Sequence, residues 1–490
     1  MLLAGRFISL GLNFLTQVVT VRYLTKSDYG AFAYALTLAS IGSSVALFSM
    51  DKSISRFLPI YDENKEDEKQ RGTLVLTLGI IVGISIALIA LVYGFRGFIE
   101  QRLISNSLSV SLLLVVIMLT PVGALDNWFQ TLFAVFASAR AIFIRRYILG
   151  PGLKLAAVLF VIVMSANVHV LAWGYVVGGA TGILAYALML RQIMGKHRVF
   201  QNWNWHNLRL PVREIMGFST PLMYSDAVFI LRNNVILIII EYFHSSVGVA
   251  EFRSVVPVAR LNEVVLQSFT FLYTPLAARL FARRDKEGIN DLYWRTALWI
   301  IVFSFPMFIV SFSLAEPVTI LLFGQRYASS SSILALLSLG YYFNAALGFN
   351  NYTLRVYGVI RYILLIDFIA ATFTVISGLI LIPPYGAFGA AVSAASALIL
   401  YNLLNHLGLK RYTDINLFDW RYLKAYVMVT VGAFSLLIIQ LVFEPSIFIG
   451  LPIAAIISLM ILRLNRSQLN IADTFPELLK FGLFRKILGA

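Results

Sequence analysis

Apolar runs of about twenty residues recur along almost the whole of this 490-residue chain. As an α-helix, a run of that length crosses a hydrocarbon core of roughly 30 Å. The chain is 59% hydrophobic and only 13% charged, which leaves too little polar surface for a soluble domain. The first run, residues 2–21, leads into further spans and lacks the cleavage pattern of a signal peptide. The sequence therefore predicts an all-α polytopic membrane protein without a separable soluble domain.

We expect about fourteen transmembrane helices, arranged as two six-helix lobes and a C-terminal pair. The Pro383-Pro384 pair is expected to end the eleventh helix, and Pro445 to precede the last. The predicted spans lie near 2–21, 30–50, 72–94, 108–136, 147–165, 169–190, 214–240, 249–278, 295–315, 330–354, 362–382, 387–406, 422–442 and 446–462.

A weak internal repeat suggests how these helices are grouped. Residues 23–35 resemble residues 241–253, and residues 130–143 resemble residues 351–364. This repeat suggests lobes at 1–195 and 196–410, followed by helices 13 and 14 and a cytoplasmic tail at 411–490. Two-lobed transporters of this kind bind their substrate between the repeats, near the middle of the membrane.

The charged residues orient the predicted helices. Most of the 39 Lys and Arg fall in connections on one side, including Arg140, Arg145 and Arg146, whereas the other side has few. By the positive-inside rule, this places both termini in the cytoplasm. We expect the protein in the plasma (inner) membrane. The net charge of +15 is then explained by short loops that face anionic lipid, and no nucleic-acid partner is expected.

Metal and cofactor sites are not indicated. The chain has no cysteine, and its five histidines are scattered without a ligand spacing. We expect no metal, no cofactor and no catalytic nucleophile, and therefore not an enzyme.

A few basic residues fall inside the predicted spans: Arg6, Lys154, Arg232, Arg253 and Arg260. Counting from Gly248 at 1.5 Å per residue places Arg253 about 8 Å deep and Arg260 about 18 Å deep. The two arginines are seven residues apart and share a face of a helix that Pro257 is expected to kink. Intramembrane charge costs at least ~2.5 kcal/mol per residue and normally faces a cavity or pathway.

We interpret these residues as part of a central cationic cavity for an anionic substrate, because arginine matches phosphate and carboxylate groups. The predicted substrate-binding residues are Arg260, Arg253, Arg232, Asn233, Asn13 and Arg6. Glu263 and Asp226 are candidates for ion or proton coupling. Structural roles remain open: Arg260 and Glu263 can form a helix-locking pair, and Arg253 and Arg6 can extend to an interface. Lys154, Asp126 and Asp367 are equally compatible with structural roles.

Several stretches resemble the polysaccharide-flippase family of the multidrug/oligosaccharidyl-lipid/polysaccharide exporter superfamily. They are residues 22–59, beginning RYLTKSDYGAFAYA, and the more specific block 322–401, which ends LIPPYGAFGAAVSAASALILY. The resemblance extends over essentially the whole chain. It implies a V-shaped, two-lobed transporter of twelve to fourteen helices, in which Arg56 is similar to an arginine near the cytoplasmic substrate entrance.

The function implied by the resemblance is flipping of polyprenyl-(pyro)phosphate-linked oligosaccharide from the cytoplasmic to the outer leaflet by alternating access. Membrane lipid is an expected partner, as are a glycan polymerase or glycosyltransferases of the same pathway. A peptidoglycan-precursor flippase and a multidrug antiporter of the same superfamily are alternatives. A membrane-embedded polysaccharide polymerase or ligase is an alternative from another class, although all predicted outer loops are short and no Asp-x-Asp motif occurs.

Overall fold

The structure, a computed structural model, describes residues 2–103, 106–136, 138–194 and 208–469. The described residues form helices and no strands, which confirms the predicted all-α class. Two compact units divide the chain, Met1–Ser254 (unit 1) and Val255–Ala490 (unit 2), and each is described by itself. The lobe boundary predicted at 195/196 lies outside the described residues.

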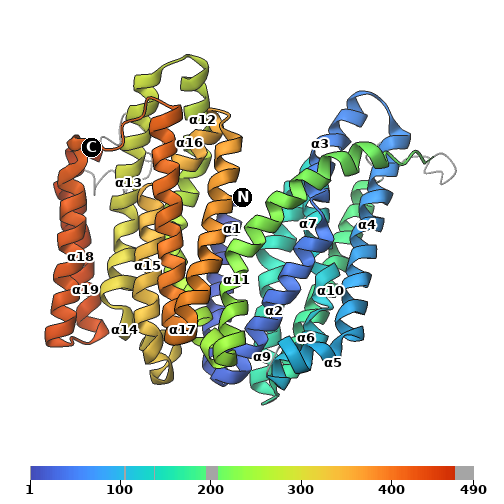
Figure 1. The fold of residues 1–490 in the computed structure, drawn as a ribbon, viewed down its shortest axis with the longest axis horizontal. Coiled ribbons are helices and arrows are strands. Elements are labelled where there is room, and N and C mark those ends of the chain that lie inside the picture. Colours follow the sequence, from blue (N-terminus) through green and yellow to red (C-terminus); the bar gives the residue numbers. More distant parts are fainter. Residues whose placement is uncertain (1, 104–105, 137, 195–207, 470–490) are drawn as a thin grey trace. The chain divides into compact units, whose positions relative to one another are not determined.

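Unit 1 contains the helices coloured blue to green in Figure 1. Its elements are α1 (Leu2–Tyr23), α2 (Lys26–Leu47), α3 (Met50–Glu63), α4 (Asp67–Gly94), α5 (Arg96–Phe98), the π-helix η1 (Ile99–Leu103), α6 (Ser107–Val116), α7 (Leu119–Val135), α8 (Ala139–Ile142), the π-helix η2 (Phe143–Leu149), α9 (Gly150–Val163), α10 (Val168–Met194) and most of α11 (Val212–Ala259).

Helix α2 lies at the centre of unit 1, where it packs against α6 and α7. Its first turn is capped by Thr25, whose side chain accepts a hydrogen bond from the backbone N–H of Asp28. Phe48 and Ser49 both have a left-handed backbone, and this separates α2 from α3. A buried aromatic cluster that includes Trp128, Phe133 and Tyr186 fills the space between α7 and α10.

Unit 2 contains a second set of helices. Its elements are the 3₁₀-helix η5 (Arg260–Glu263), α12 (Val264–Ala282), α13 (Lys286–Ser313), α14 (Ala315–Phe323), the 3₁₀-helix η6 (Gln325–Ser330), α15 (Ser331–Ala346), α16 (Asn350–Val356), α17 (Ile360–Tyr412), the 3₁₀-helix η7 (Trp420–Tyr422), α18 (Leu423–Phe443), α19 (Ile447–Leu464) and α20 (Arg466–Leu469).

Helix α13 is the most deeply buried span of unit 2 and contacts α12, α15, α18 and α19. Trp294 and Trp299 of α13 are 1% and 0% exposed, so its middle is enclosed by large side chains. Across the same core, Tyr273 of α12 stacks on Phe349 with ring centroids 4.1 Å apart. Helices α18 and α19 form a hairpin that meets α13 through small residues: Gly432 lies close to Phe305, and Gly450 close to Leu314.

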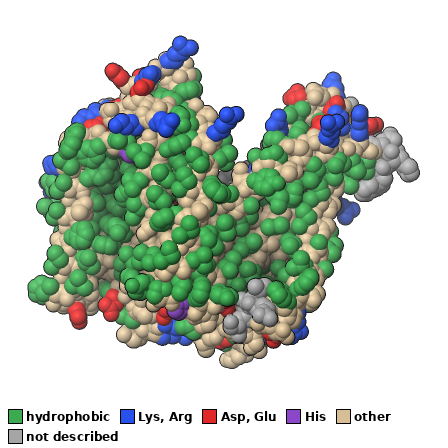
Figure 2. Space-filling view, in the orientation of Figure 1, with side chains coloured by type: hydrophobic (Ala, Val, Ile, Leu, Met, Phe, Trp, Pro, Cys, Tyr) green, Lys and Arg blue, Asp and Glu red, His purple; other side chains and the backbone are tan. Residues whose placement is uncertain are grey.

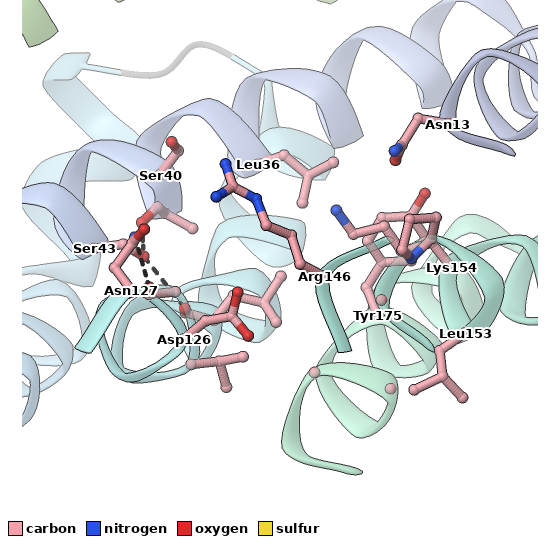
Figure 3. Close-up of a pocket in the computed structure, with 18 of the residues that line it drawn as sticks. Asn13, Leu36, Ser40, Ser43, Asp126, Asn127, Arg146, Leu153, Lys154 and Tyr175 are labelled. Carbon is pink, nitrogen blue, oxygen red and sulfur yellow. Dashed lines mark hydrogen bonds between the residues drawn. The ribbon is translucent and has the colours of Figure 1, made fainter. Parts of the chain in front are cut away.

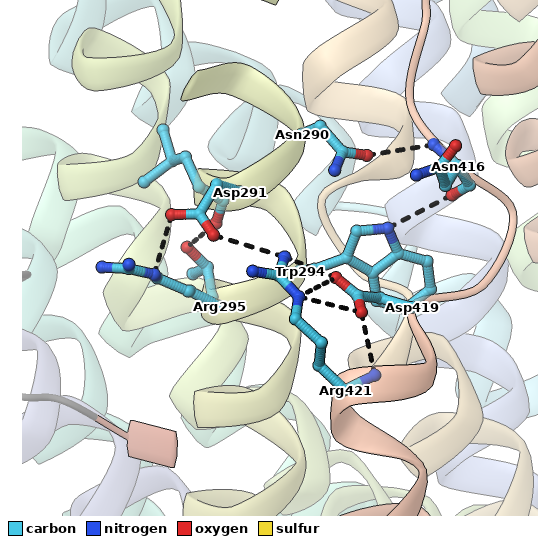
Figure 4. A network of polar contacts seen from close by, with 9 residues as sticks. Asn290, Asp291, Trp294, Arg295, Asn416, Asp419 and Arg421 are labelled. Atoms are coloured by element: carbon cyan, nitrogen blue, oxygen red, sulfur yellow. Dashed lines mark hydrogen bonds and ion pairs between the residues drawn. The ribbon is translucent and has the colours of Figure 1, made fainter. Parts of the chain in front are cut away.

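A cluster of polar contacts ties the connection between α17 and α18 to the start of α13 (Figure 4). The backbone N–H of Asn416 donates to Asn290 Oδ1 at 3.0 Å, and Trp294 Nε1 donates to the Asn416 carbonyl at 3.2 Å. Arg421 holds both carboxylate oxygens of Asp419 at 2.6–3.0 Å and also contacts Asp291 at 3.4 Å. We call these contacts, together with the Lys286–Asp414 ion pair, the 413–421 clasp.

The described residues include ten helical segments that are long and apolar enough to cross a membrane, or eleven if the bent pair Ser107–Val116 and Leu119–Val135 is one span. Two of the ten, Val212–Ala282 and Ile360–Tyr412, contain 71 and 53 residues. At 1.5 Å per residue they are roughly 105 Å and 80 Å long, which far exceeds one bilayer crossing. Non-helical backbone at Ser245 and Gly386 divides them. Eight of the ten segments are single spans, and the two long ones contribute two spans each. With the bent pair and α1 added, the total equals the fourteen predicted helices.

In both units, the distribution of apolar and charged side chains on the surface is typical of a membrane protein. On the visible face of each unit, apolar side chains cover the middle of the helices and charged side chains collect at the two ends (Figure 2). Such a band is the surface expected of helices that contact lipid.

Candidate functional site

Unit 1 encloses a cavity of about 490 Å³ among α1, α2, α7, η2, α9, α10 and α11. This volume lies within the ~300–1,000 Å³ range of small-molecule sites. Its charged lining residues are Asp126, Arg145, Arg146, Lys154 and Arg253, and Asn13, Ser40, Ser43, Ser44, Asn127 and Tyr175 add polar groups. Four basic side chains against one acidic side chain leave a formal excess of three positive charges.

Arg145 is the most enclosed of these basic side chains, with 7% of its surface exposed. Its guanidinium pairs with Asp126 of α7 at 2.8 Å and lies over the ring of Tyr186, 5.5 Å from the centroid. The space for it exists because two neighbours are glycines: a Cβ on Gly182 would be 2.4 Å from the guanidinium, and one on Gly150 would be 2.5 Å away. The buried Nε has no hydrogen-bond partner among the described residues.

Arg146 and Lys154 are more open to the cavity. Figure 3 shows Arg146 extending toward Leu36 and Ser40 of α2, and Lys154 beside Tyr175. The Lys154 ammonium lies 6.0 Å from the centre of the Tyr175 ring. Arg145 and Arg146 belong to the π-helix η2, and such local widening of a helix is frequent at functional sites.

Asn13 and Arg253 are the two predicted substrate-binding residues that line this cavity. Asn13 donates from Nδ2 to the Ser9 carbonyl at 2.7 Å, one turn earlier in α1. Arg253 lies in the second segment of α11, after the break at Ser245. The structure therefore brings these two side chains to one cavity, and their substrate binding stays a prediction.

Other predicted residues of unit 1 are not among the described residues that line this cavity. Asn233 is exposed on α11 and donates to the Phe229 carbonyl at 2.7 Å. Arg232 lies over the ring of that same Phe229, 5.8 Å from its centroid. Arg6 is partly buried near the start of α1.

Asp226 and Arg56 both have partners in unit 1. Asp226 of α11 accepts hydrogen bonds from Lys52 and Ser49, each at 2.5 Å, at the start of α3. Arg56 is exposed on α3 and lies over the ring of Phe218, 4.5 Å from its centroid.

Arg260 and Glu263 lie in unit 2, at the two ends of η5. Arg260 donates from Nε to the hydroxyl of Tyr341 at 3.0 Å, and Glu263 accepts a hydrogen bond from Asn344. Both partners belong to α15, and Asn262 of the same 3₁₀ turn donates to Ser311 of α13 at 3.1 Å, so the turn is held to two neighbouring helices. A mid-helix 3₁₀ turn often marks a hinge.

Of the four basic residues in the cavity, only Arg253 was predicted to bind substrate, Lys154 was equally compatible with a structural role, and Arg145 and Arg146 were not predicted as site residues. Arg145 and Arg146 were predicted to lie in a cytoplasmic loop, but the structure places them in a helical turn continuous with α9. A usable signal exists in the sequence: Arg146, Gly150 and Lys154 follow at intervals of four and therefore share one helix face. Asp126 was noted, but its contact with Arg145 depends on tertiary packing.

In the part of the chain that the structure describes, no three His, Asp or Glu side chains are grouped in a way that could hold a metal ion.

The family model described as "Polysaccharide biosynthesis protein" matches residues 1–281, which is more than half of the chain. This match confirms the resemblance at the level of the family, although it ends before the block 322–401. An uncharacterized membrane protein of Methanocaldococcus jannaschii is 21% identical, with 98% of this chain and 97% of that protein aligned. The capsular polysaccharide biosynthesis protein CapF of Staphylococcus aureus is 24% identical over 79% of this chain and 93% of its own length.

Solved structures share the fold. The lipid II flippase MurJ, in its inward closed conformation, matches with a TM-score of 0.75 and 13% identity over 95% of this chain and 98% of its own. An inward-facing multidrug resistance MATE family transporter of the MOP superfamily matches with a TM-score of 0.63 and 14% identity over 82% of this chain and 94% of its own. This chain is thus a multi-pass membrane protein that belongs to the polysaccharide biosynthesis protein family and has the fold of MurJ and the MATE transporters.

Proposed function

We propose that this protein is a flippase that moves a polyprenyl-(pyro)phosphate-linked oligosaccharide from the cytoplasmic to the outer leaflet, for surface polysaccharide or glycan synthesis. The observation that carries the proposal is the basic cavity of unit 1, with Arg145, Arg146, Lys154 and Arg253 against Asp126. The family to which the chain belongs, and the capsular polysaccharide biosynthesis relative, support the glycan assignment.

The chemistry of this cavity suits an anionic headgroup. Phosphate oxygens accept hydrogen bonds from arginine and lysine, and these bonds are strongest where water is excluded. Arg145 is paired with Asp126, whereas Arg146 and Lys154 present further positive charge to the cavity and would meet the charge of a substrate. A cationic drug would be repelled by this excess, which argues against a multidrug antiporter.

The cycle that follows is alternating access. The (pyro)phosphate and the first sugars enter the polar cavity while the polyprenyl chain stays in lipid, because only the headgroup requires shelter from hydrocarbon. Release requires the contacts between the anion and the basic side chains to weaken in the other conformation.

Residues outside the described lining have proposed roles in the same cycle. Arg260, Arg232, Asn233 and Arg6 would contact the substrate on its path. Arg56 would lie at the cytoplasmic entrance, where its exposed position on α3 suits a first contact. Glu263 and Asp226 would carry a coupling ion or proton.

The proposal also includes the arrangement in the cell. Lobes at 1–195 and 196–410 would move against each other, with 411–490 contributing helices 13 and 14 and a tail. Both termini would be cytoplasmic in the inner membrane, and polymerase or glycosyltransferases would act before and after the flippase in the pathway. The protein itself would be a transporter and not an enzyme.

A deletion strain complemented with cavity variants tests the function. We expect the deletion to accumulate lipid-linked repeat units on the cytoplasmic leaflet, as identified by mass spectrometry and leaflet-specific labelling. Arg146→Gln and Lys154→Gln should each restore export poorly, because one charged hydrogen bond lost corresponds to about 1.5–3 kcal/mol, or about tenfold to a hundredfold. The matched control is Arg96→Gln, which removes a 60% exposed arginine that does not line the cavity and should restore export fully.

The accumulated molecule separates the alternatives. Accumulation of a peptidoglycan precursor would replace the glycan substrate with lipid II. Normal lipid levels together with altered glycan chain length would contradict transport and indicate a polymerase or ligase.

A further inference from the structure

A buried carboxyl group lies at the end of the first segment of α11, away from the basic cavity. Glu241 is 3% exposed and precedes the break at Ser245 by one helical turn. The break is packed closely: a Cβ on Gly30 of α2 would be 1.7 Å from the Ser246 carbonyl oxygen, so α2 touches the α11 backbone directly. The carboxyl group is thus enclosed where α2, α6 and α11 meet.

The hydrogen bonds to this carboxyl group all reach one of its two oxygens. Ser109 of α6 donates to Glu241 Oε1 at 2.7 Å, and Ser246 donates to the same oxygen at 3.0 Å. Asn106 in turn donates to Ser246 Oγ at 2.7 Å, which orients the serine hydroxyl. The other oxygen, Oε2, is buried and has no partner among the described residues.

This asymmetry matches a protonated carboxyl group. A carboxylate carries its charge on both oxygens and is stabilised by donors at both, whereas the acid form accepts chiefly at its carbonyl oxygen and carries an O–H donor on the other oxygen. An ionised Glu241 would in addition be buried with only two hydroxyl donors, and such a charge is unfavourable without a counter-ion.

The charged and titratable neighbours do not supply that counter-ion. On α2, Lys26 pairs with Glu251 of α11 at 2.8 Å. On α10, His169 shares a hydrogen bond with Ser111 of α6 at 3.0 Å, two residues after Ser109. His244 lies on α11 beside the break, where its Cβ faces Gly248.

We propose that Glu241 is a proton-binding site, occupied while α2 and α6 pack against the break in α11. Separation of these elements admits water, the carboxyl O–H bond ionises, and one proton passes to that water. Packing takes one proton up again. In the predicted topology this water is on the outer side, so outer pH sets how readily this region opens.

The absence of cysteine from the chain allows a direct test in the full-length protein. Ala250→Cys places a thiol at a fully buried position after the break, and Val247→Cys places one at a position that is 41% exposed. Labelling by a membrane-impermeant maleimide is measured from pH 5 to 8, and the ratio of the two rates removes the pH dependence of the thiol reaction. We expect the ratio to rise toward tenfold per pH unit, because opening releases one proton.

The same two cysteine variants, each combined with Glu241→Gln, show whether Glu241 is the group that releases the proton. The ratio should then be low and independent of pH, since the amide is neutral in both states. A pH-independent ratio in the protein with Glu241, or the same rise in Glu241→Gln, would overturn the proposal. If Glu241→Gln does not fold, His169→Gln with His244→Gln decides: loss of the rise would assign the proton to a histidine, and a retained rise leaves it on Glu241.

Discussion

Arg145 keeps its position because two of its neighbours have no side chain. Gly150 and Gly182 leave room for the guanidinium, Asp126 balances its charge, and Tyr186 covers one face. In this way a charge that lipid would exclude is held at the wall of a cavity. The glycines are consequently as important to the site as the residues that carry charge.

A methyl group at residue 182 tests this arrangement. We expect Gly182→Ala to displace the guanidinium, to reduce glycan export, and to destabilise the protein by about 1–3 kcal/mol through overpacking. Thermal unfolding in detergent and export in the complemented deletion strain provide the two measurements. Gly83→Ala in α4 is the control, because nothing lies within 4 Å of its added Cβ and the residue does not line the cavity. Equal behaviour of the two variants would show that the guanidinium is not confined by Gly182.

Two long helical elements are broken by single residues with positive φ, and the two residues differ in kind. Gly386 has φ 56° and ψ −135° in α17, two residues after Pro384. Ser245 has φ 61° and ψ −177° in α11, a region that is occupied almost solely by glycine. The break in α17 is thus made by a residue suited to it, whereas the break in α11 carries strain.

Opposite substitutions at the two breaks should have opposite effects. Ser245→Gly is expected to raise the unfolding temperature, because relief of the strain contributes about 1–3 kcal/mol and exceeds the added chain entropy. Gly386→Ala should lower it by a comparable free energy. Circular dichroism melts of both variants in the same detergent measure this, and a lower unfolding temperature for Ser245→Gly would contradict the assigned backbone conformation.

The 413–421 clasp responds to pH through Asp419. Burial raises the pKa of this carboxyl group, but the hydrogen bonds and charge of Arg421 outweigh it and hold the pKa below its usual value. A depressed pKa in the folded state stabilises the protein above the unfolded pKa of about 3.9, and this stabilisation is lost as pH falls through the folded value.

Asp419→Asn should therefore cost about 1 kcal/mol at pH 7, a modest value because Arg421 is 58% exposed. Asparagine keeps an oxygen that can accept the backbone N–H of Arg421, so the charge is the main loss. Unfolding is compared from pH 7 to pH 3, and the difference from the unsubstituted protein should shrink below about pH 4. Asp414→Asn is the control, since its pair with Lys286 is exposed on both sides and should contribute little. A difference that persists at pH 3 would rule out the ionised carboxylate as its cause.

For the molecule as a whole, the distribution of basic residues predicts which ends of the helices face the cytoplasm. Asn167→Cys, between α9 and α10, should be labelled by an impermeant maleimide in intact cells. Arg283→Cys, between α12 and α13, should be labelled only after permeabilisation. Both positions are exposed, so access and not burial decides the result. The reverse pattern would invert the topology.

The sequence predicts what depends on neighbours along the chain. The length of the apolar runs predicted the helices. The Pro383-Pro384 pair predicted the break in α17, because proline acts on the backbone next to it. Contacts between residues far apart in the chain could not be predicted. Ser109 contacts Glu241 across 132 residues, and Asp126 contacts Arg145 through the packing of α7 against η2 and α10. The distribution of basic residues also assigned Arg145 to a cytoplasmic loop. In a sequence, a basic residue at a helix end looks the same whether its side chain faces water or a cavity.

The α18–α19 hairpin has a consequence for how this protein is assembled. It is synthesised well after α13, so the faces of α13 around Phe305 and Leu314 must first be covered by lipid chains. Docking then exchanges lipid for protein, and the hydrophobic effect contributes little to an exchange of one apolar neighbour for another. The close approach at Gly432 and Gly450, together with the hydrogen bond from Ser313 of α13 to the Ala433 carbonyl of α18 at 2.8 Å, then supplies the driving force. Insertion into the bilayer and attachment to the rest of the protein are thus separate events for this hairpin.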